Sequence, residues 1–234
     1  MHETLPDARR VLVIGAHPDD PEFFCAGTIA RWTQAGVVVR FVVVTSGDKG
    51  RPPDWSSAEE FARVREAEQQ ASARILGVEG ITFLRFTDGE VFDTLELRER
   101  LTAEIRRFRP DLLVTHDPLT RLYRQHPDHR AVGAAALAAA FPLCRLSTFF
   151  PWQLQEGLRP HAVRRALLFG TDQPDTAVDI STVFEHKLAA LRLHATQADA
   201  FPGGLEKRVR RRAEEAGRPF GLPLAEAFLA VELD

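Results

Sequence analysis

The chain has 234 residues, of which 44% are hydrophobic and 27% are charged, and its formal net charge is −3. This composition allows a full hydrophobic core, and we expect a single domain over residues 1–234. The near-neutral charge gives no reason to expect a nucleic-acid partner, and two distant cysteines exclude a disulfide scaffold and a four-cysteine zinc site.

The beginning of the chain lacks the apolar core of a signal peptide, so the sequence predicts a cytoplasmic protein. Its longest run of low polarity, residues 131–141, is too short to cross a bilayer, and we therefore expect no membrane span. The basic stretch over residues 207–212 is typical of the solvated face of a helix. The sequence allows the protein to be a homo-oligomer but does not predict its oligomeric state.

Apolar runs alternate with helical patterns along most of the chain, which predicts an α/β fold. We expect a Rossmann-like, mostly parallel sheet flanked by helices, with the site at the carboxyl edge of the strands. The predicted strands are residues 11–16, 37–45, 81–86, 112–114, 166–169 and 176–180. The predicted helices are residues 23–34, 58–76, 95–108, 129–140 and 183–195, followed by a basic helix and a short tail over residues 224–233. A polar loop over residues 46–54 is predicted to border the site.

Two of the predicted strands are followed by clusters of histidine and aspartate. These clusters are His17, Asp19 and Asp20 after the first strand, and His126, Asp128 and His129 after the fourth. In open α/β sheets, ligands bind beyond the carboxyl ends of the strands. Buried charges are costly unless they are paired or bind a ligand, so the two clusters together predict one metal centre.

The spacing of these residues suits a hydrolytic zinc ion, which needs three protein ligands and an open position for water. His17 and Asp20 are three residues apart and can chelate one ion. A lone pair of this kind more often caps a helix or satisfies a turn, but here a second cluster accompanies it. The third ligand is His126 or His129, and spacing alone does not separate these two.

Several motifs in one order resemble the LmbE-like (PIG-L) family of zinc-dependent de-N-acetylases. They are Ala16-His-Pro-Asp-Asp20 with Glu22, Gly27-Thr28, Thr45-Ser-Gly-Asp-Lys-Gly50, Arg65-x-x-Glu68, Leu76-Gly77, Thr115-His-Asp-Pro118, His126-Pro-Asp-His129 and Lys187-x6-His194-x2-Gln197. The resemblance covers nearly the whole chain. The chain departs from the family pattern at Ala26, where a second glycine often stands, and in Asp20-Pro21-Glu22, which is one residue longer than the commonest spacing.

The resemblance implies roles for individual residues. His17, Asp20 and His129 would bind zinc, and Asp19 would be the general base. His126 would face the substrate, stabilise the oxyanion and protonate the leaving amine, with Asp128 orienting it. The remaining candidates are Arg65, as a ligand of a substrate hydroxyl or carboxylate, and His194, as a residue of the pocket or one that supports the ligands from behind. The implied reaction removes the N-acetyl group from a small glucosamine-like substrate, which is a sugar, a glycoside or a thiol precursor.

Three other classes of function share part of this sequence pattern. A dinucleotide-binding protein is disfavoured because the first strand is followed by His17-Pro18-Asp19 instead of a glycine-rich turn. Two histidines and one carboxylate also describe the site of a non-haem iron oxygenase, so ligand type alone leaves that class open. A sugar-binding or metal-binding protein without turnover is the third alternative, although a closed structural site needs neither Asp19 nor His126.

Overall fold

The computed structural model describes residues 7–55, 57–120, 125–198 and 204–233. Within them lies one sheet with the strand order β3-β2-β1-β4-β5-β7-β6. The strands are β1 (Arg10–Gly15), β2 (Val38–Thr45), β3 (Gly80–Phe86), β4 (Leu112–His116), β5 (Arg165–Phe169), β6 (Thr176–Asp179) and β7 (Ala225–Glu232). The strands β1 to β5 pair in parallel, whereas β7 runs antiparallel to β5 and β6. This arrangement confirms the predicted α/β fold.

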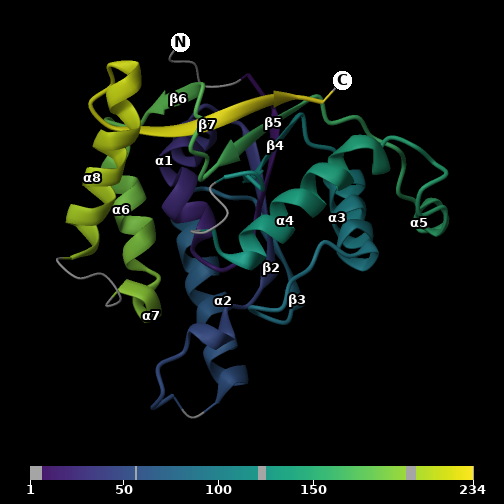
Figure 1. The fold of residues 1–234 in the computed structure, drawn as a ribbon, viewed down its shortest axis with the longest axis horizontal. Coiled ribbons are helices and arrows are strands. Elements are labelled where there is room, and N and C mark those ends of the chain that lie inside the picture. The colour runs from purple at the N-terminus through teal and green to yellow at the C-terminus, as the bar shows by residue number, and fades with distance from the viewer. Residues whose placement is uncertain (1–6, 56, 121–124, 199–203, 234) are drawn as a thin grey trace.

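Helices cover both faces of this sheet (Figure 1). They are α1 (Asp20–Gln34), α2 (Ala58–Ile75), α3 (Leu95–Phe108), α4 (Pro127–Ala138), α5 (Trp152–Gln155), α6 (Phe184–Arg192), α7 (Ala195–Ala198) and α8 (Leu205–Gly217). Side chains alternate along β1, so Val11 and Val13 pack towards α1, α6 and α8, while Leu12 and Ile14 pack towards α3 and α4. None of the described helices is long and apolar enough to cross a membrane.

Two helices begin earlier than the sequence predicted, and both carry candidate site residues in their first turns. Helix α1 begins at Asp20, and α4 begins at Pro127. In each case a proline stands at the start, where its missing N–H costs no hydrogen bond and its fixed φ suits the helix. The first turns therefore present Asp20, Asp128 and His129 directly at the sheet edge.

The predicted tail over residues 224–233 is wrong, because most of it forms the strand β7 inside the sheet. Its sequence does not alternate cleanly between apolar and polar residues, since Glu226 is buried among apolar neighbours. In the register of β7 with β5, Phe228 pairs with Phe169. In its register with β6, Ala225 pairs with Asp179. The last part of the sheet is therefore antiparallel.

Glu226 joins β7 to a kink in α1. The helix is interrupted at Cys25, whose φ of −146° is not helical, so the N–H groups of Gly27 and Thr28 lack the usual partners within the helix. The Glu226 carboxylate accepts from both, at 2.9 and 2.7 Å. It also pairs with the buried Lys187 of α6, 2.6 Å away. This contact fixes the helix that carries Asp20.

The basic stretch over residues 207–212 lies on α8. Arg210 forms long ion pairs with Glu185 and Glu206, and Arg211 pairs with Glu215, so these two side chains lie on the solvated face, as predicted. Arg212 differs, because its guanidinium lies over the ring of Phe24 in α1. One member of the basic stretch is thus directed at the body of the protein.

Candidate active site

The candidate site residues meet where β1 and β4 lie side by side. Helical connections leave these two neighbouring strands in opposite directions, to β2 on one side and to β5 on the other. Such a switch point opens a crevice at the carboxyl ends of the strands. His17 follows β1, His116 ends β4, and α4 begins beside them with Pro127. The two sequence clusters are therefore brought together at the predicted edge.

Three nitrogen and oxygen atoms converge in this crevice. Nδ1 of His17 lies 3.2 Å from Nε2 of His129, and that nitrogen lies 3.2 Å from Oδ1 of Asp20. Nδ1 of His17 lies 3.6 Å from Oδ2 of Asp20. The Asp20 carboxylate is held in place because its Oδ2 accepts from the backbone N–H groups of Ala16 and His17. These three side chains form a candidate metal site.

His129 and His126 lie differently relative to Asp20, although the ring nitrogens of His17, His126 and His129 are also close enough together to hold an ion. His129 contacts Asp20, whereas the His126 ring lies 4.8 Å from the His17 ring, on the exposed side of the cluster. Nδ1 of His126 accepts from the backbone N–H of Asp128, at 3.2 Å. Burial lowers the pKa of His126, and the nearby His17 and His129 lower it further.

Nε2, the second ring nitrogen of His17, is paired with two carboxylates. Oδ1 of Asp88 lies 3.1 Å away, and Oδ2 of Asp128 lies 3.2 Å away. Burial alone would lower the pKa of His17, but hydrogen bonds to Asp128, Asp20 and Asp88 outweigh it and raise the pKa well above the usual value. A carboxylate on the far nitrogen orients a metal-binding histidine and fixes its tautomer.

Asp88 was missed by the sequence analysis, and Asp128 lies differently from the expectation. Asp88 follows β3 at the same sheet edge, and that position was the signal that could have found it. The Asp128 carboxylate accepts from the backbone N–H groups of Gly89 and Val91 besides contacting His17. It was expected to orient His126, but its contact with that ring is made by the backbone N–H.

His116 lies behind the three converging side chains. Its Nε2 is 3.2 Å from Oδ2 of Asp20 and 3.2 Å from the backbone N of Ala16. Its ring stacks on that of His129, with the ring centres 4.0 Å apart. Burial and the charge of His129 lower the pKa of His116 to about 4, so its neutral ring packs against the cluster at neutral pH.

Asp19 stands beside the candidate metal site in a strained backbone conformation. Its φ of 101° is rare for a residue with a side chain, and such strain is concentrated at functional sites. Its backbone N–H donates to Oε1 of Gln69, and its carboxylate accepts from Arg65 at 3.0 Å. Burial raises the pKa of Asp19 to about 6, against the lowering effect of the Arg65 charge.

Arg65 is buried, with 4% of its surface exposed. Its Nε has no hydrogen-bond partner among the described residues, whereas its two terminal amino groups are used within the protein. They bind the carbonyl oxygens of Gly47 and Pro18 as well as the Asp19 carboxylate. Gly47 has a left-handed φ of 64°, and a Cβ there would overlap the guanidinium. Arg65 therefore ties the loop after β2 to the strained turn at Asp19, and because it also lines the cavity, its contact with a substrate stays a prediction.

His194 is also buried, with 1% of its surface exposed, and lies close to Glu22 of α1. Its Nε2 is 3.4 Å from Oε2 of Glu22, while the other carboxylate oxygen accepts from Gln69 and Ser72 of α2. Burial lowers the pKa of His194, but Glu22 outweighs this effect and raises it. The structure places His194 in a buried polar cluster with Glu22, and its expected contact with the substrate stays a prediction.

A cavity of about 380 Å³ opens above these groups. Its lining includes His17, Asp19, Asp20, His126 and His129, together with Asp88 and Arg65. Lys49 and Gly50 also line it, so the polar loop over residues 46–54 borders the site, as predicted. The cavity is within the size range of small-molecule sites, about 300–1,000 Å³.

Comparisons with known proteins agree with this geometry. Residues 12–140 match the PIG-L family, described as GlcNAc-PI de-N-acetylase. The chain is 36% identical over 197 residues to the diacetylchitobiose deacetylase of Thermococcus kodakarensis, a match that covers 84% of this chain and 73% of that protein. It is 31% identical over 229 residues to the 1D-myo-inositol 2-acetamido-2-deoxy-alpha-D-glucopyranoside deacetylase of Mycobacteroides abscessus, covering 81% of each.

A solved structure is similar over nearly the whole chain. The N,N'-diacetylchitobiose deacetylase of Pyrococcus horikoshii superposes with a TM-score of 0.90 at 34% sequence identity, over 96% of this chain and 84% of that one. The matched family region contains both clusters of histidine and aspartate that meet at the crevice. The chain therefore belongs to the PIG-L (LmbE-like) family.

Proposed function

We propose that this protein is a metal-dependent hydrolase that removes the N-acetyl group from a glucosamine-like substrate. The observation that carries the proposal is the convergence of His17, Asp20 and His129 beside the partly buried carboxylate of Asp19. Relatives that match most of the chain are named as deacetylases of N-acetylated glucosamine compounds. The site supports the reaction class, and these relatives support the sugar.

The three converging side chains fit a zinc ion. Two imidazoles and one carboxylate are a common ligand set of catalytic zinc. Tetrahedral ligands at about 2.0–2.1 Å from zinc are about 3.3 Å from one another. The separations of 3.2, 3.2 and 3.6 Å are close to that value. When bound, zinc would polarise the substrate carbonyl and make a water molecule acidic enough to ionise near neutral pH.

Asp19 is the proposed general base. It lines the cavity next to Asp20, and a base works best when its pKa is close to the working pH. The pKa of about 6 keeps Asp19 ionised at neutral pH, yet basic enough to accept a proton from the attacking water. Arg65 and Gln69 hold its side chain and its strained backbone, and we assign them as positioning residues.

His126 is the proposed electrophile beside the candidate metal ligands. Because its Nδ1 accepts a hydrogen bond from the Asp128 backbone, the proton of the neutral ring lies on Nε2. That N–H can donate a hydrogen bond to the oxyanion that develops on the acetamide oxygen. The leaving amine takes up the proton that Asp19 accepts from the attacking water, so the protons balance. Asp88 and Asp128 orient His17, and His194 supports Glu22 below the base.

The proposal is tested by measuring free-amine release from the zinc-loaded protein. The substrates are N-acetylglucosamine, its methyl glycoside, N,N'-diacetylchitobiose and acetamides without a sugar. We expect equal amounts of amine and acetate from at least one sugar. Amine release from the non-sugar amides alone would leave a metallohydrolase but remove the sugar. Oxygen-dependent turnover with iron, or sugar binding without any product, would overturn the proposal.

The role of Asp19 is tested by the Asp19→Asn variant. This change keeps the shape of the side chain and removes its basic oxygen, so we expect kcat to fall by about 10² or more, as is typical of a lost general base. Bound zinc is measured in the same samples and is expected to stay at the parental level. Asp54→Asn is the matched control, because it removes an exposed carboxylate from the loop that borders the site. A kcat within a few-fold of the parent for Asp19→Asn would refute this role.

A further inference from the structure

A second cavity lies on the other side of His126 and His129. Its volume is about 440 Å³, and these two histidines belong to its lining as well as to that of the catalytic cavity. From them it extends past Phe169 and Gly170 to Arg212. Each cavity alone is within the range of small-molecule sites, about 300–1,000 Å³. The site therefore has room for a substrate with a second group beyond the acetylated ring.

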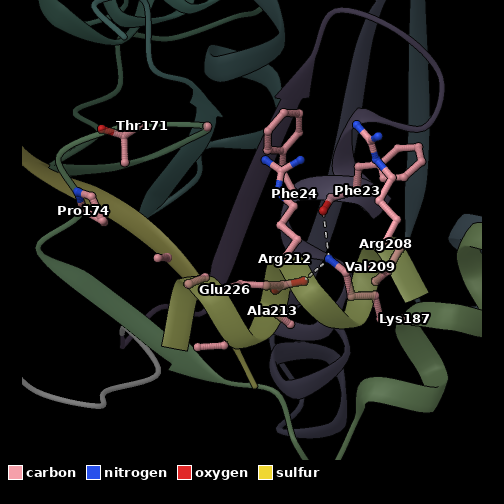
Figure 2. A pocket seen from close by; sticks show the side chains of 14 residues that line it. Phe23, Phe24, Thr171, Pro174, Lys187, Arg208, Val209, Arg212, Ala213 and Glu226 are labelled. Atoms are coloured by element: carbon pink, nitrogen blue, oxygen red, sulfur yellow. Dashed lines mark hydrogen bonds and ion pairs between the residues drawn. The ribbon is translucent and has the colours of Figure 1, made fainter. Parts of the chain in front are cut away.

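Arg212 marks the far end of this second cavity. Its guanidinium lies 4.5 Å above the ring centre of Phe24, which stacks on Phe169 and meets the rings of His116 and His129 edge-on. Figure 2 shows Arg212 and Arg208 extending from α8 towards Phe24 and Phe23. A guanidinium stacked flat on a ring keeps its N–H groups free at its edge. A row of aromatic rings thus connects Arg212 to the candidate metal ligands.

Among the described residues Arg212 forms no ion pair, although Asp117 and Asp172 also line the second cavity. Its neighbours Arg210 and Arg211 form ion pairs on the outer face of α8, but Arg212 forms none with the part of the chain that the structure describes. The side chain of Arg212 is exposed, so its guanidinium is accessible to a ligand in the second cavity. An anion placed against Arg212 would form the ion pair that the described residues do not supply.

Arg208 extends the positive region. Below Arg212 lies a smaller cavity of about 160 Å³ that shares Phe24, Gly170 and Arg212 with the second cavity. Arg208 lines this smaller cavity, one helical turn from Arg212. An acidic group that enters the second cavity from the catalytic site would therefore meet first Arg212 and then Arg208.

We infer that the second cavity binds the aglycone of the substrate and that Arg212 selects an aglycone carrying a carboxylate or a phosphate. This inference rests on the proposed deacetylase function, and it narrows the substrate to acidic N-acetylglucosaminides. The acetylated ring occupies the cavity of Asp19, and the acidic group reaches Arg212 past His126 and His129. Arg212 is a specificity-determining residue that contacts the substrate away from the reacting atoms.

The test compares substrates that differ only in the charge of the aglycone. One pair is an N-acetylglucosaminide with a carboxylate aglycone and its neutral methyl ester, and a phosphate-bearing glycoside forms a second arm. We expect the parent to prefer the acid in kcat/KM by about 10- to 100-fold, the range for charge-assisted hydrogen bonds, chiefly through KM. The acidic aglycone, carboxylate or phosphate, that gives the larger increase in kcat/KM is the group that the site binds.

Arg212→Gln is expected to remove most of this preference. Arg212→Met repeats the test with a side chain that still packs on Phe24, in case the glutamine variant is unstable. Arg211→Gln is the control, since it removes a neighbouring charge from the outer face of α8. A parent without preference for either acid, or an equal preference in the Arg212 and Arg211 variants, would overturn the inference.

A binding measurement separates this inference from the proposed function. Calorimetry on the metal-free protein with the deacetylated acidic glycoside needs no turnover. We expect Arg212→Gln to raise its Kd by about 10-fold or more relative to Arg211→Gln. If no substrate is hydrolysed but this difference is found, the proposed reaction fails and the anion site remains. If hydrolysis occurs and the Kd values are equal, only the anion site is refuted.

Discussion

Replacing Glu226 with glutamine tests the contact between the last strand and the first helix. The side chain is 3% exposed, and its carboxylate accepts from the backbone N–H groups of Gly27 and Thr28, from the Thr28 hydroxyl and from Lys187. Glutamine keeps the size of the side chain but offers an amide NH₂ in place of one of the two oxygens. The Lys187 ammonium, 4% exposed, would then lack its anion.

The expected loss follows from the burial of this pair. Removing one partner of a buried ion pair costs about 3–5 kcal/mol, because it leaves an uncompensated charge. In a chain of this size, each kcal/mol lowers Tm by about 2–4 °C, so Glu226→Gln should lower Tm by about 6–20 °C. Thermal unfolding followed by circular dichroism measures this shift.

Glu206→Gln is the control, because Glu206 forms an exposed ion pair with Arg192. The side chain of Glu206 is 53% exposed and that of Arg192 is 56% exposed. Its Tm should stay within about 2 °C of the parent, as expected for an exposed pair. The double variant Glu226→Gln/Lys187→Met should recover part of the loss, since no buried charge is left unpaired. A Glu226→Gln protein that unfolds within about 2 °C of the parent would refute this reasoning.

Two further predictions concern α4 and the metal. In Gly133→Ala, the added methyl group would overlap the carbonyl oxygen of His116. The free energy of unfolding, measured in urea, should therefore fall by about 1–3 kcal/mol. An unchanged free energy would show that α4 can shift to accommodate the methyl group. Zinc at 100 times its Kd should stabilise the metal-free protein by about 2.7 kcal/mol, seen as a rise in Tm. The His17→Ala/His129→Ala variant should lose this rise, and an unaltered shift would refute the ligand assignment.

The sequence predicted where the site lies because strand ends are easy to recognise. The apolar run of β1 stops at His17, and parallel strands bring their carboxyl ends to one edge. The sequence could not tell which of His126 and His129 is the metal ligand, because both belong to one short motif. That choice depends on the first turn of α4, which places His129 against Asp20 and leaves His126 beside the open cavity. Side-chain direction within a turn is not visible in residue spacing.

Buried charges account for what the sequence analysis missed. Asp88 stands in a short turn after β3, where a carboxylate is ordinary, and only the fold brings it to His17. Glu226 made a strand look like a polar tail, although its charge is compensated by Lys187 and by the helix N–H groups of α1. Arg65 was predicted as a ligand of the substrate, but its ion pair with Asp19 could not be predicted from the sequence. In each case the partner lies far away in the chain.

The position of β7 between β5 and β6 bears on the order in which the chain folds. Within the described sheet, β6 pairs with β7 alone, so it cannot join the sheet before residues 225–232 have docked on β5. The bond from Gly27 to Glu226 spans 199 positions in the chain. Closing such a long loop costs entropy and slows folding. We therefore expect the half of α1 that Glu226 contacts to settle late, and the first turn of the same helix, which carries Asp20, to reach its final position in one of the last steps of folding.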